Sequence, residues 1–323
     1  MRILFTLHDL QYSGGTETFT YSIIKEFLGN NHEIFLYSTR IGTVSEKYID
    51  LGVHVTDNLN DLPEHVDIIH AQHRAEAITI YYKYPSTPMI FTSHGIIPWQ
   101  EKPISIPSIF KYVAVSEEVQ NYLIENFEIK NDKTCIIRNG IDQSRFRPSV
   151  KINEQPQKLL LLSNRYTENV KNVLEEVALK MDMKFKIIGQ SQNNVWNVEK
   201  EILESDIVVS LGRGILEAMS CGRLPIVFDY NGGDGIVTEN NYYLFRKKNF
   251  SGRFCNINFT AEQIIKLISE SYKSEVIEKN LKLAIQFHDI KVIASEYFEL
   301  YELALKKSTN TFDINPNIIE YLI

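Results

Sequence analysis

The chain has 323 residues, of which 44% are hydrophobic and 23% charged, values typical of a soluble globular protein. This length suits two domains, each with its own core, and the composition argues against disorder and against a fibrous fold. Lys and Arg number 34 against 41 Asp and Glu, so the net charge of -7 provides no general basic field for nucleic acid or anionic lipid. We therefore expect no nucleic-acid partner, and a phosphate-bearing ligand would have to be bound by local groups.

The cysteines and the N-terminus indicate a compartment. Cys135, Cys221 and Cys255 are odd in number and show no CxxC spacing, which favours reduced thiols in a cytoplasm. The short apolar run after Arg2 is broken by His8, so it predicts a first strand and not a signal peptide. No stretch reaches the roughly 20 apolar residues of a membrane-spanning helix. We expect a cytoplasmic protein, and peripheral contact with the inner face of the membrane stays open.

The first part of the chain alternates short β-rich runs with amphipathic segments. Between the first two runs, Phe19, Ile23 and Phe27 form a helical stripe that ends near Gly29, which predicts a β-α-β unit. Most of these runs are apolar on both faces, as buried parallel strands are. The predicted strands are 2–8, 33–38, 53–57, 66–72, 89–94, 112–116 and 134–139.

A polar stretch with two prolines at 145–158 interrupts this pattern and predicts a linker. A second series of predicted strands follows at 158–164, 183–189, 206–212 and 224–230. The prediction is an α/β protein with two doubly wound parallel sheets, in domains 1–148 and 149–290. Ligands of such sheets bind beyond the carboxyl ends of the strands, so the loops there should carry the function.

Two glycine-containing loops precede predicted helices. Gly14 and Gly15 would let backbone approach a ligand at a helix N-terminus, and a tight turn with Thr16 as N-cap is the alternative. In "GRGILEAMSCG", Gly212 and Gly214 precede a helix whose first turn is predicted to contain Glu217.

This second loop is not a dinucleotide fingerprint, because Glu217 stands where G-x-G-x-x-G has its third glycine. An acid near bound phosphates is tolerated if it faces the ribose hydroxyls of the ligand. A solvated glutamate that favours the helix dipole is the alternative.

Cationic and histidine side chains follow other predicted strands. Arg165 lies just past a strand and Lys171 on the next helix, so both could bind one anion, although such residues are usually surface charges. His94 follows an apolar strand and could be functional or structural. His70 and His73 are predicted to be structural, with His73 the better candidate for a site.

Six motifs occur in the order found in retaining GT-B glycosyltransferases of family 4, and the chain resembles that family over almost its whole length. The motifs are "SGGTETF", "FTSHG", "VAVSEEV", "RNGID..RFRP", "SNR...VK" and "GILEAMSCGRLPIVFDYNGG". The resemblance implies two Rossmann-like domains facing a cleft. It also implies that the segment 291–323 forms a helix that packs back on the first domain.

The resemblance also implies a role for each candidate residue. A sugar would be transferred from a nucleotide-sugar donor to a glycan or lipid-linked acceptor in polysaccharide biosynthesis, with retention of anomeric configuration. His94 would lie near the transferred sugar, Arg165 and Lys171 at the diphosphate, and Glu217 at the ribose. Backbone contacts with the donor would come from Gly14, Gly15, Gly212, Arg213, Gly214, Ile215, Gly232 and Gly233.

The chain departs from the family pattern at two places. The usual first glutamate, eight positions before Glu217, is Val209, so sugar recognition would fall to Arg213, Asp229 or the loop 231–235. Lys171 lies six residues after Arg165 where five are expected, which weakens its assignment.

Several points remain alternatives at this stage. The chain has no Asp-x-Asp motif, so we expect no metal and no cofactor besides the donor, for which UDP is the first choice. The apolar segment 95–110 is either a folded loop or a surface for a lipid-linked acceptor. A sugar-nucleotide epimerase of the same fold and a non-catalytic sugar-nucleotide-binding protein are the rival functions.

Overall fold

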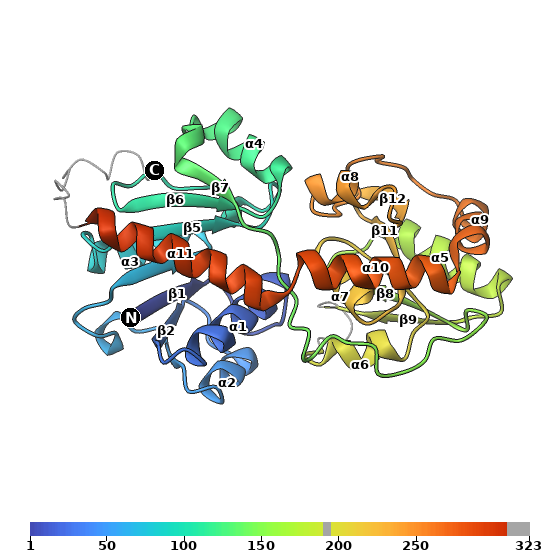
Figure 1. The fold of residues 1–323 in the computed structure, drawn as a ribbon, viewed down its shortest axis with the longest axis horizontal. Coiled ribbons are helices and arrows are strands. Elements are labelled where there is room, and N and C mark those ends of the chain that lie inside the picture. The colour runs from blue at the N-terminus through green and yellow to red at the C-terminus, as the bar shows by residue number, and fades with distance from the viewer. Residues whose placement is uncertain (190–194, 309–323) are drawn as a thin grey trace. The chain divides into compact units, whose positions relative to one another are not determined.

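The computed structural model describes residues 1–189 and 195–308 and divides them into two compact units (Figure 1). The first unit comprises residues 1–12, 16–138 and 291–308, and the second comprises 13–15 and the described part of 139–290. Residues 139–148, which the sequence analysis assigned to the first domain, lie in the second unit. There the Ile141 N–H donates to the His288 carbonyl at 2.7 Å, and Phe146 is buried in the core.

The first unit is built on a parallel sheet of seven strands in the order β3-β2-β1-β4-β5-β6-β7. All seven strands predicted in this part of the chain are confirmed. The central strands β1, β4 and β5 are buried on both faces, as expected of parallel strands, whereas the edge strand β3 is partly exposed. The strands are β1 (Arg2–Leu7), β2 (Glu33–Ser38), β3 (His54–Thr56), β4 (Ile68–Ala71), β5 (Met89–Ser93), β6 (Ile109–Ala114) and β7 (Thr134–Ile136).

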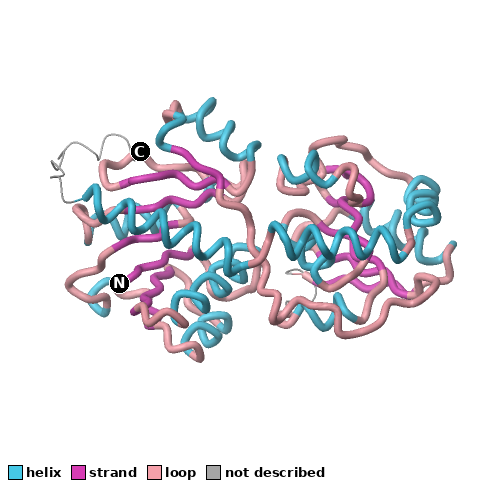
Figure 2. The backbone as a smooth tube through the Cα atoms, in the orientation of Figure 1, coloured by secondary structure: helices cyan, strands magenta, loops and turns pink. Residues whose placement is uncertain are grey.

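Helices cover the sheet of the first unit, as the cyan segments around magenta strands show (Figure 2). The predicted stripe of Phe19, Ile23 and Phe27 is buried, and it holds α1 against the sheet. The helices are α1 (Gly15–Leu28), α2 (Thr43–Ile49), α3 (Arg74–Lys83), α4 (Glu117–Phe127) and α11 (Ile290–Ser308).

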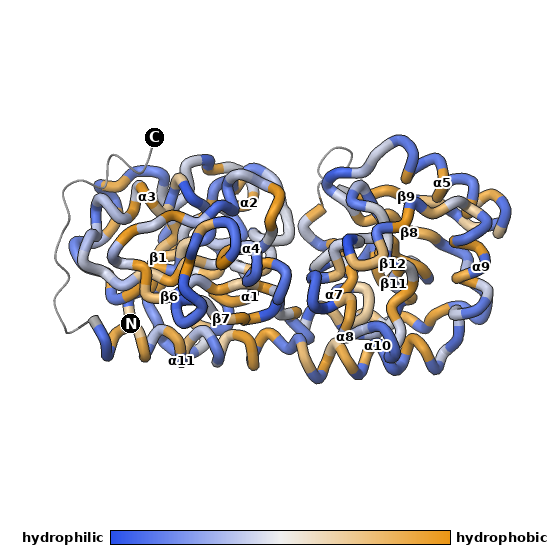
Figure 3. Tube along the Cα trace, turned by 90° about the horizontal axis from the view of Figure 1, so that it is seen from above, coloured by the Kyte–Doolittle hydropathy of each residue, from blue (hydrophilic) through white to orange (hydrophobic). Residues whose placement is uncertain are grey.

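The last described helix, α11, packs on the sheet of the first unit and lies along one side of its strands (Figure 3). The Tyr301 hydroxyl lies 2.5 Å from His70 Nδ1, and Thr92 Oγ1 lies 2.9 Å from His70 Nε2. Burial lowers the pKa of His70 to about 3, so this histidine stays neutral and has the structural role predicted for it. Residues 309–323 of the predicted terminal segment lie outside the described residues.

The second unit has a sheet of five strands in the order β12-β11-β10-β8-β9, and β12 alone runs antiparallel to its neighbour. The four predicted strands are confirmed. The fifth corrects the prediction, because most of the expected loop 231–235 forms β12. The strands are β8 (Lys158–Leu162), β9 (Lys184–Ile188), β10 (Ile207–Ser210), β11 (Leu224–Asp229) and β12 (Gly232–Ile236).

Two clusters of buried apolar side chains form the core of the second unit, and helices cover them. The helices are α5 (Glu168–Lys180), α6 (Val198–Leu203), α7 (Arg213–Ser220), α8 (Tyr242–Lys247), α9 (Ala261–Ser271) and α10 (Ser274–Phe287). Both units therefore have the α/β architecture predicted for them. Among the described helices of the whole chain, none is both long and apolar enough to span a bilayer.

Candidate functional site

The carboxyl edge of the first sheet gathers four polar side chains. His8 follows β1, Gln72 and His73 follow β4, and His94 follows β5, and β1, β4 and β5 are neighbours in the sheet. Ligands of parallel α/β sheets bind at this edge. The predicted candidates His94 and His73 therefore lie where the fold places functional groups.

His94 is held at both its backbone and its ring. Its N–H donates to Glu101 Oε2 at 2.8 Å, and its Nε2 lies 2.8 Å from Gln72 Oε1. The Gln72 amide nitrogen donates to Thr20 at 2.6 Å, so the Gln72 oxygen faces His94 and accepts the Nε2 proton. The ring of Phe19 packs edge-on at 5.2 Å. These contacts fix the orientation of His94 at the strand end.

Glu101 and Gln72 are site residues that the sequence reasoning missed. Burial raises the pKa of Glu101 to about 8, and the charge of Glu17 adds to this shift against the backbone donors of His94 and Gly95. At neutral pH the Glu101 carboxyl therefore carries a proton. In the sequence, Glu101 is marked only as an acid within an apolar segment, and Gln72 has no distinguishing feature besides its place between His70 and His73.

Gly15 is the first residue of α1, which overturns the alternative of Thr16 as N-cap, because Thr16 lies inside the helix. A Cβ added to Gly15 would meet no described atom within 4 Å. Neither packing nor a left-handed backbone therefore requires glycine at this position. Gly14 precedes it at the start of the helix, and close approach of a ligand stays the prediction for both glycines.

In the second unit, Gly212 is the N-cap of α7 with φ 57°, a left-handed value that favours glycine. Gly214 lies inside the helix, which corrects the prediction that it precedes it. A Cβ on Gly214 would lie 2.2 Å from Ser210 Oγ, so its lack of a side chain lets α7 pack on β10. The N–H of Ile215 donates back to the Gly212 carbonyl at 3.2 Å.

The start of α7 offers donors to an anion. The N–H groups of Arg213 and Gly214 have no acceptor among the described residues, as is usual at a helix N-terminus. Gly214 also packs against Leu162 at the end of β8. This helix start therefore lies beside the strand end that Arg165 follows.

Glu217 lies in the second turn of α7 and not in the first, because the helix begins at Arg213. Its Oε1 accepts from Arg213 Nε at 2.9 Å, and both side chains are 6% exposed. Arg213 Nη1 also donates to the Gly140 carbonyl at 2.8 Å. Burial raises the pKa of Glu217 and lowers that of Arg213, while their mutual attraction opposes both shifts. The solvated glutamate of the alternative interpretation is therefore wrong.

The two predicted cations differ in their surroundings. Arg165 is exposed after β8, and its side chain has no hydrogen-bond or ion-pair partner among the described residues. Lys171 is 32% exposed in α5 and pairs with Glu168 at 3.5 Å, an exposed contact worth little in stability. Arg165 is thus the better anion ligand of the two.

An acid stands at the same edge of the second sheet. Ser163 Oγ donates to Asp229 Oδ2, and the Tyr230 N–H donates to Asp229 Oδ1 at 2.8 Å. Burial raises the pKa of Asp229 to about 6 against these hydrogen bonds. Asp229 is one of the three predicted alternatives for sugar recognition. Its hydrogen bond with Ser163 places it beside the chain segment that carries Arg165.

Gly232 and Gly233 lie in β12, where packing explains why each is glycine. A Cβ on Gly233 would lie 2.6 Å from the Phe259 ring, and Gly232 has φ 85° beside Asn256. Both glycines are buried. The pair therefore has a structural reason independent of a donor, and its donor contact stays a prediction.

Val209 is fully buried in β10, where it pairs with Leu161 and Ile226. A glutamate at this position would lie in the core. The position eight residues before Glu217 therefore lies in the core and not at the site. The spacing of a sequence motif does not determine where the strand before it ends.

The apolar segment 95–110 is partly buried and partly exposed, and its role as a surface for a lipid-linked acceptor stays a prediction. Ile104, Ile106 and Ile109 are buried as a folded loop requires. Ile97 and Trp99 are 50% and 56% exposed.

In the described part of the chain, no three His, Cys, Asp or Glu side chains lie together as a metal site requires.

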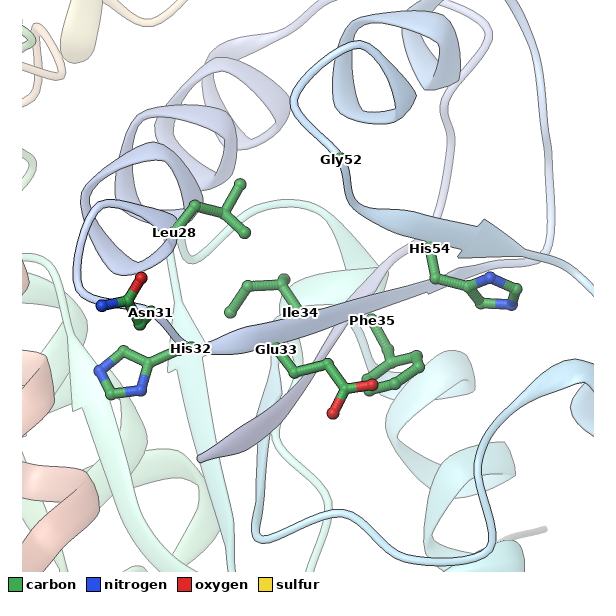
Figure 4. Close-up of a pocket in the computed structure, with 8 residues that line it drawn as sticks. All are labelled: Leu28, Asn31, His32, Glu33, Ile34, Phe35, Gly52 and His54. Carbon is green, nitrogen blue, oxygen red and sulfur yellow. The ribbon is translucent and has the colours of Figure 1, made fainter.

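A pocket in the first unit lies at the amino edge of its sheet, where β2 and β3 begin (Figure 4). This edge is opposite to that of His94, so the pocket does not belong to the candidate site. It is lined by Leu28, Asn31, His32, Glu33, Ile34, Phe35, Gly52 and His54.

Comparison with known proteins adds a family match over part of the chain and a fold. The model of Glycosyltransferase Family 4 matches residues 13–145, and no curated protein matches the chain. A glycosyltransferase from Rickettsia africae aligns with a TM-score of 0.67 at 20% identity, over 96% of this chain and 99% of that one. Anabaena HepE, solved with UDP-glucose, aligns with a TM-score of 0.66 at 13% identity, over 94% and 100%.

The same fold also occurs in a protein of a rival class. A proposed UDP-N-acetylglucosamine 2-epimerase from Listeria monocytogenes aligns with a TM-score of 0.58 at 8% identity, over 97% of this chain and 99% of that one. Fold alone therefore does not separate transfer from epimerisation. The family match and the fold together show that this chain is a GT-B protein that resembles the family 4 glycosyltransferases.

Proposed function

We propose that the protein transfers a sugar from a nucleotide diphosphate donor, bound by the second unit, to a hydroxyl of a glycan or lipid-linked acceptor bound by the first. UDP is the proposed nucleotide, and HepE, which has the same fold, was solved with UDP-glucose. Retention of configuration, metal independence and the hexosyl class are further parts of the proposal that rest on the family resemblance.

One observation carries the proposal: the free N–H groups at the start of α7 lie beside the strand end that Arg165 follows. Helix N-terminal donors and the helix dipole favour a phosphate, and the Arg165 guanidinium can bind phosphate oxygens in pairs. Developing charge on the departing diphosphate would be stabilised by these preorganised groups. Lys171 would add a weaker contact.

The other proposed donor contacts come from residues of α7, β11 and β12. Arg213 orients the Glu217 carboxylate, which would accept from the ribose hydroxyls. Asp229 would face the sugar. Its raised pKa favours the protonated form below about pH 6 and the carboxylate above it. Gly232 and Gly233 would contribute backbone only.

Gly14 and Gly15 would let the donor phosphate and the acceptor approach the start of α1, and His94 would contact the transferred sugar. The exposed Ile97 and Trp99 suit an acceptor with a lipid anchor, since apolar side chains outside a core favour apolar ligands. Peripheral contact with the membrane from a cytoplasmic location would follow from such an acceptor.

Incubation of the full chain with UDP-sugars and GDP-sugars tests the proposal. Release of nucleotide together with free sugar supports a transferase that uses water in place of its acceptor. A donor epimerised without release would support an epimerase. Stabilisation of the protein without any turnover would support a binding protein.

A further inference from the structure

The segment 248–252 follows α8 and packs against both glycine-containing elements of the second unit. The N–H of Gly212, at the start of α7, donates to the Phe250 carbonyl at 2.9 Å. A Cβ added to Gly252 would lie 2.5 Å from the carbonyl oxygen of Gly232, the first residue of β12. The segment therefore lies against the backbone of both elements to which the sequence analysis assigned donor contacts.

Two residues of this segment have a left-handed backbone although neither is glycine. Asn249 and Phe250 both have φ 51°, a value that residues with side chains rarely adopt, and two in succession cost free energy. The buried ring of Phe250 and its backbone hydrogen bond with Gly212 offset this cost. Because the turn is held in this way, Asn249 has a fixed position beside the start of α7.

The side chain of Asn249 has its oxygen engaged and its nitrogen available. Asn139 Nδ2 donates to Asn249 Oδ1 at 3.1 Å, which leaves the amide nitrogen of Asn249 as a donor. A Cβ added to Gly212 would lie 3.6 Å from this nitrogen, so the amide lies at the start of α7. Its N–H groups have no acceptor among the described residues. A neutral donor therefore accompanies the backbone N–H groups of Arg213 and Gly214.

The chain around this segment is locally basic. Residues 240–261 contain four Lys and Arg and no Asp or Glu, whereas the whole chain has a net charge of -7. Lys248 Nζ donates to the Arg253 carbonyl at 3.0 Å, so this ammonium group lies on the segment itself. A local excess of positive charge in an acidic protein favours an anionic ligand.

Arg213 adds a buried donor without an acceptor at the same helix start. Its Nη1 donates to the carbonyl of Gly140, the residue after Asn139, and its Nη2 is buried with no hydrogen-bond partner among the described residues. Buried polar groups are nearly always paired, so such a donor indicates a bound water or ion or a functional role. The chain at 139–140 thus contacts both Arg213 and Asn249 where donors remain unpaired.

We propose that Asn249 is a phosphate ligand of the nucleotide diphosphate donor and that its amide nitrogen donates to a phosphate oxygen at the start of α7. The inference rests on the proposed transferase function and deepens it, because it adds a side chain to the anion site of Arg165. Asn139 orients the amide by holding its oxygen. Asn249 binds the part of the donor that leaves, so its role agrees with the proposed retention of configuration.

A purely structural asparagine is the alternative. Asn249 suits a left-handed turn better than most residues do, and its oxygen accepts from Asn139 whether or not a ligand is bound. An aspartate would fulfil both structural tasks, since it tolerates the same backbone and keeps the acceptor. It would also place a negative charge at the proposed phosphate contact. Asn249→Asp therefore separates the two roles.

Calorimetric titration measures the effect with inorganic pyrophosphate and with UDP or GDP, whichever nucleotide the wild type binds more tightly. Asn249→Gly suits the left-handed turn and removes the donor, so it should weaken both ligands by about 10–100-fold, the range for a hydrogen bond to a charged group. Asn249→Asp should weaken both ligands more than Asn249→Gly, because repulsion between like charges is added to the lost hydrogen bond.

Asn31→Asp is the matched control. Asn31 is exposed in the first unit and has a left-handed φ of 59°, so the variant makes the same substitution and the same change in net charge. The affinity for either ligand should stay within about twofold of the wild type, as for a surface substitution away from the site. Circular dichroism and the melting temperature show whether each variant is folded, and Asn249→Gly decides alone if Asn249→Asp does not fold.

An Asn249→Gly affinity within about twofold of the wild type, the range of a neutral surface change, would overturn the phosphate contact. An Asn249→Asp affinity equal to or above that of Asn249→Gly would overturn it as well, because this is the order of a structural asparagine. So would a loss of nucleotide affinity with unchanged pyrophosphate affinity. A wild type that binds neither nucleotide nor pyrophosphate would overturn the proposed donor site together with this role.

Discussion

Arg213 and Glu217 form an ion pair one helical turn apart in α7, with Nε and Oε1 2.9 Å apart and both side chains 6% exposed. The sequence "GRGILEAM" places them four residues apart, and the helix start at Arg213 then brings the arginine over the acid. A buried pair of this kind is sensitive to the loss of either member, because the remaining charge keeps its desolvation cost. The pair therefore links the stability of the second unit to the geometry of its predicted donor contacts.

Removal of the acid should destabilise the second unit. Glu217→Ala leaves the Arg213 guanidinium buried without its carboxylate, and we expect a loss of about 3–5 kcal/mol in the free energy of unfolding. Trp196 reports on this unit if Trp99 is replaced by Phe, so urea unfolding can be followed by fluorescence. The double variant Arg213→Met with Glu217→Met should recover most of the loss. An equal loss in the double variant would show that the charge is not the cause.

A milder change separates the ribose contact from the phosphate contact. Glu217→Gln should weaken binding of UDP by about 10–100-fold, since a hydrogen bond to a charged group is worth about 1.5–3 kcal/mol. Binding of inorganic pyrophosphate should hardly change. Calorimetric titration of both ligands is the measurement, and equal losses would place Glu217 against another part of the donor.

The exposed Arg165 should matter to the donor and not to the fold. Arg165→Ala is expected to weaken UDP binding by about 10–100-fold, from the same range of about 1.5–3 kcal/mol. Lys184→Ala, at the opposite edge of the same sheet where β9 begins, is the matched control and should leave the affinity unchanged. An unchanged affinity in Arg165→Ala would remove the proposed anion site.

Gly15 offers a test of ligand approach. Gly15→Ala should leave the melting temperature unchanged or slightly raised, because the added methyl meets no described atom within 4 Å and alanine favours a helix. Turnover should fall if a ligand comes close to this backbone. Gly214→Ala is the contrast, since its Cβ would lie 2.2 Å from Ser210 Oγ and should lower the melting temperature. Full activity in Gly15→Ala would show that no ligand needs this space.

The buried His70 should make the first unit sensitive to acid. Its folded pKa of about 3 lies below the ordinary 6.5, so the unfolded state binds more protons between these values. The free energy of unfolding is therefore not reduced by this group above pH 6.5, and it falls by about 1.4 kcal/mol per pH unit below that value. Between pH 7.5 and 5 the wild type should therefore lose about 2 kcal/mol more than His70→Gln. Urea titrations at both pH values measure this, and parallel losses in the two proteins would contradict it.

The strands could be predicted because their side chains are apolar on both faces, as in β1 and β10. The stripe of Phe19, Ile23 and Phe27 likewise determined α1 from local sequence alone. Helix starts were harder to predict. The start of α7 at Arg213 is two residues earlier than predicted, which places Glu217 in the second turn and in an ion pair with Arg213 that helix propensity does not indicate. Strand β12 was missed because its glycines resemble a loop in the sequence.

The unpredicted parts depend on contacts between distant residues. Gly233 is glycine because Phe259 packs on it, and neither residue indicates the other. The hydrogen bond between Asn139 and Asn249 joins residues 110 positions apart, and the sequence gives no period or spacing that relates them. Gln72 and Glu101 orient His94 in the same way, from a neighbouring strand end and a later loop.

The most direct test of glycosyl transfer is a time course of nucleotide release from UDP-sugars and GDP-sugars, with the sugar product identified, for the wild type and for Arg165→Ala. The wild type should release nucleotide and free sugar from at least one donor, and Arg165→Ala should do so more slowly at the same donor concentration. Absence of release from every donor, or an epimerised donor without release, would contradict glycosyl transfer.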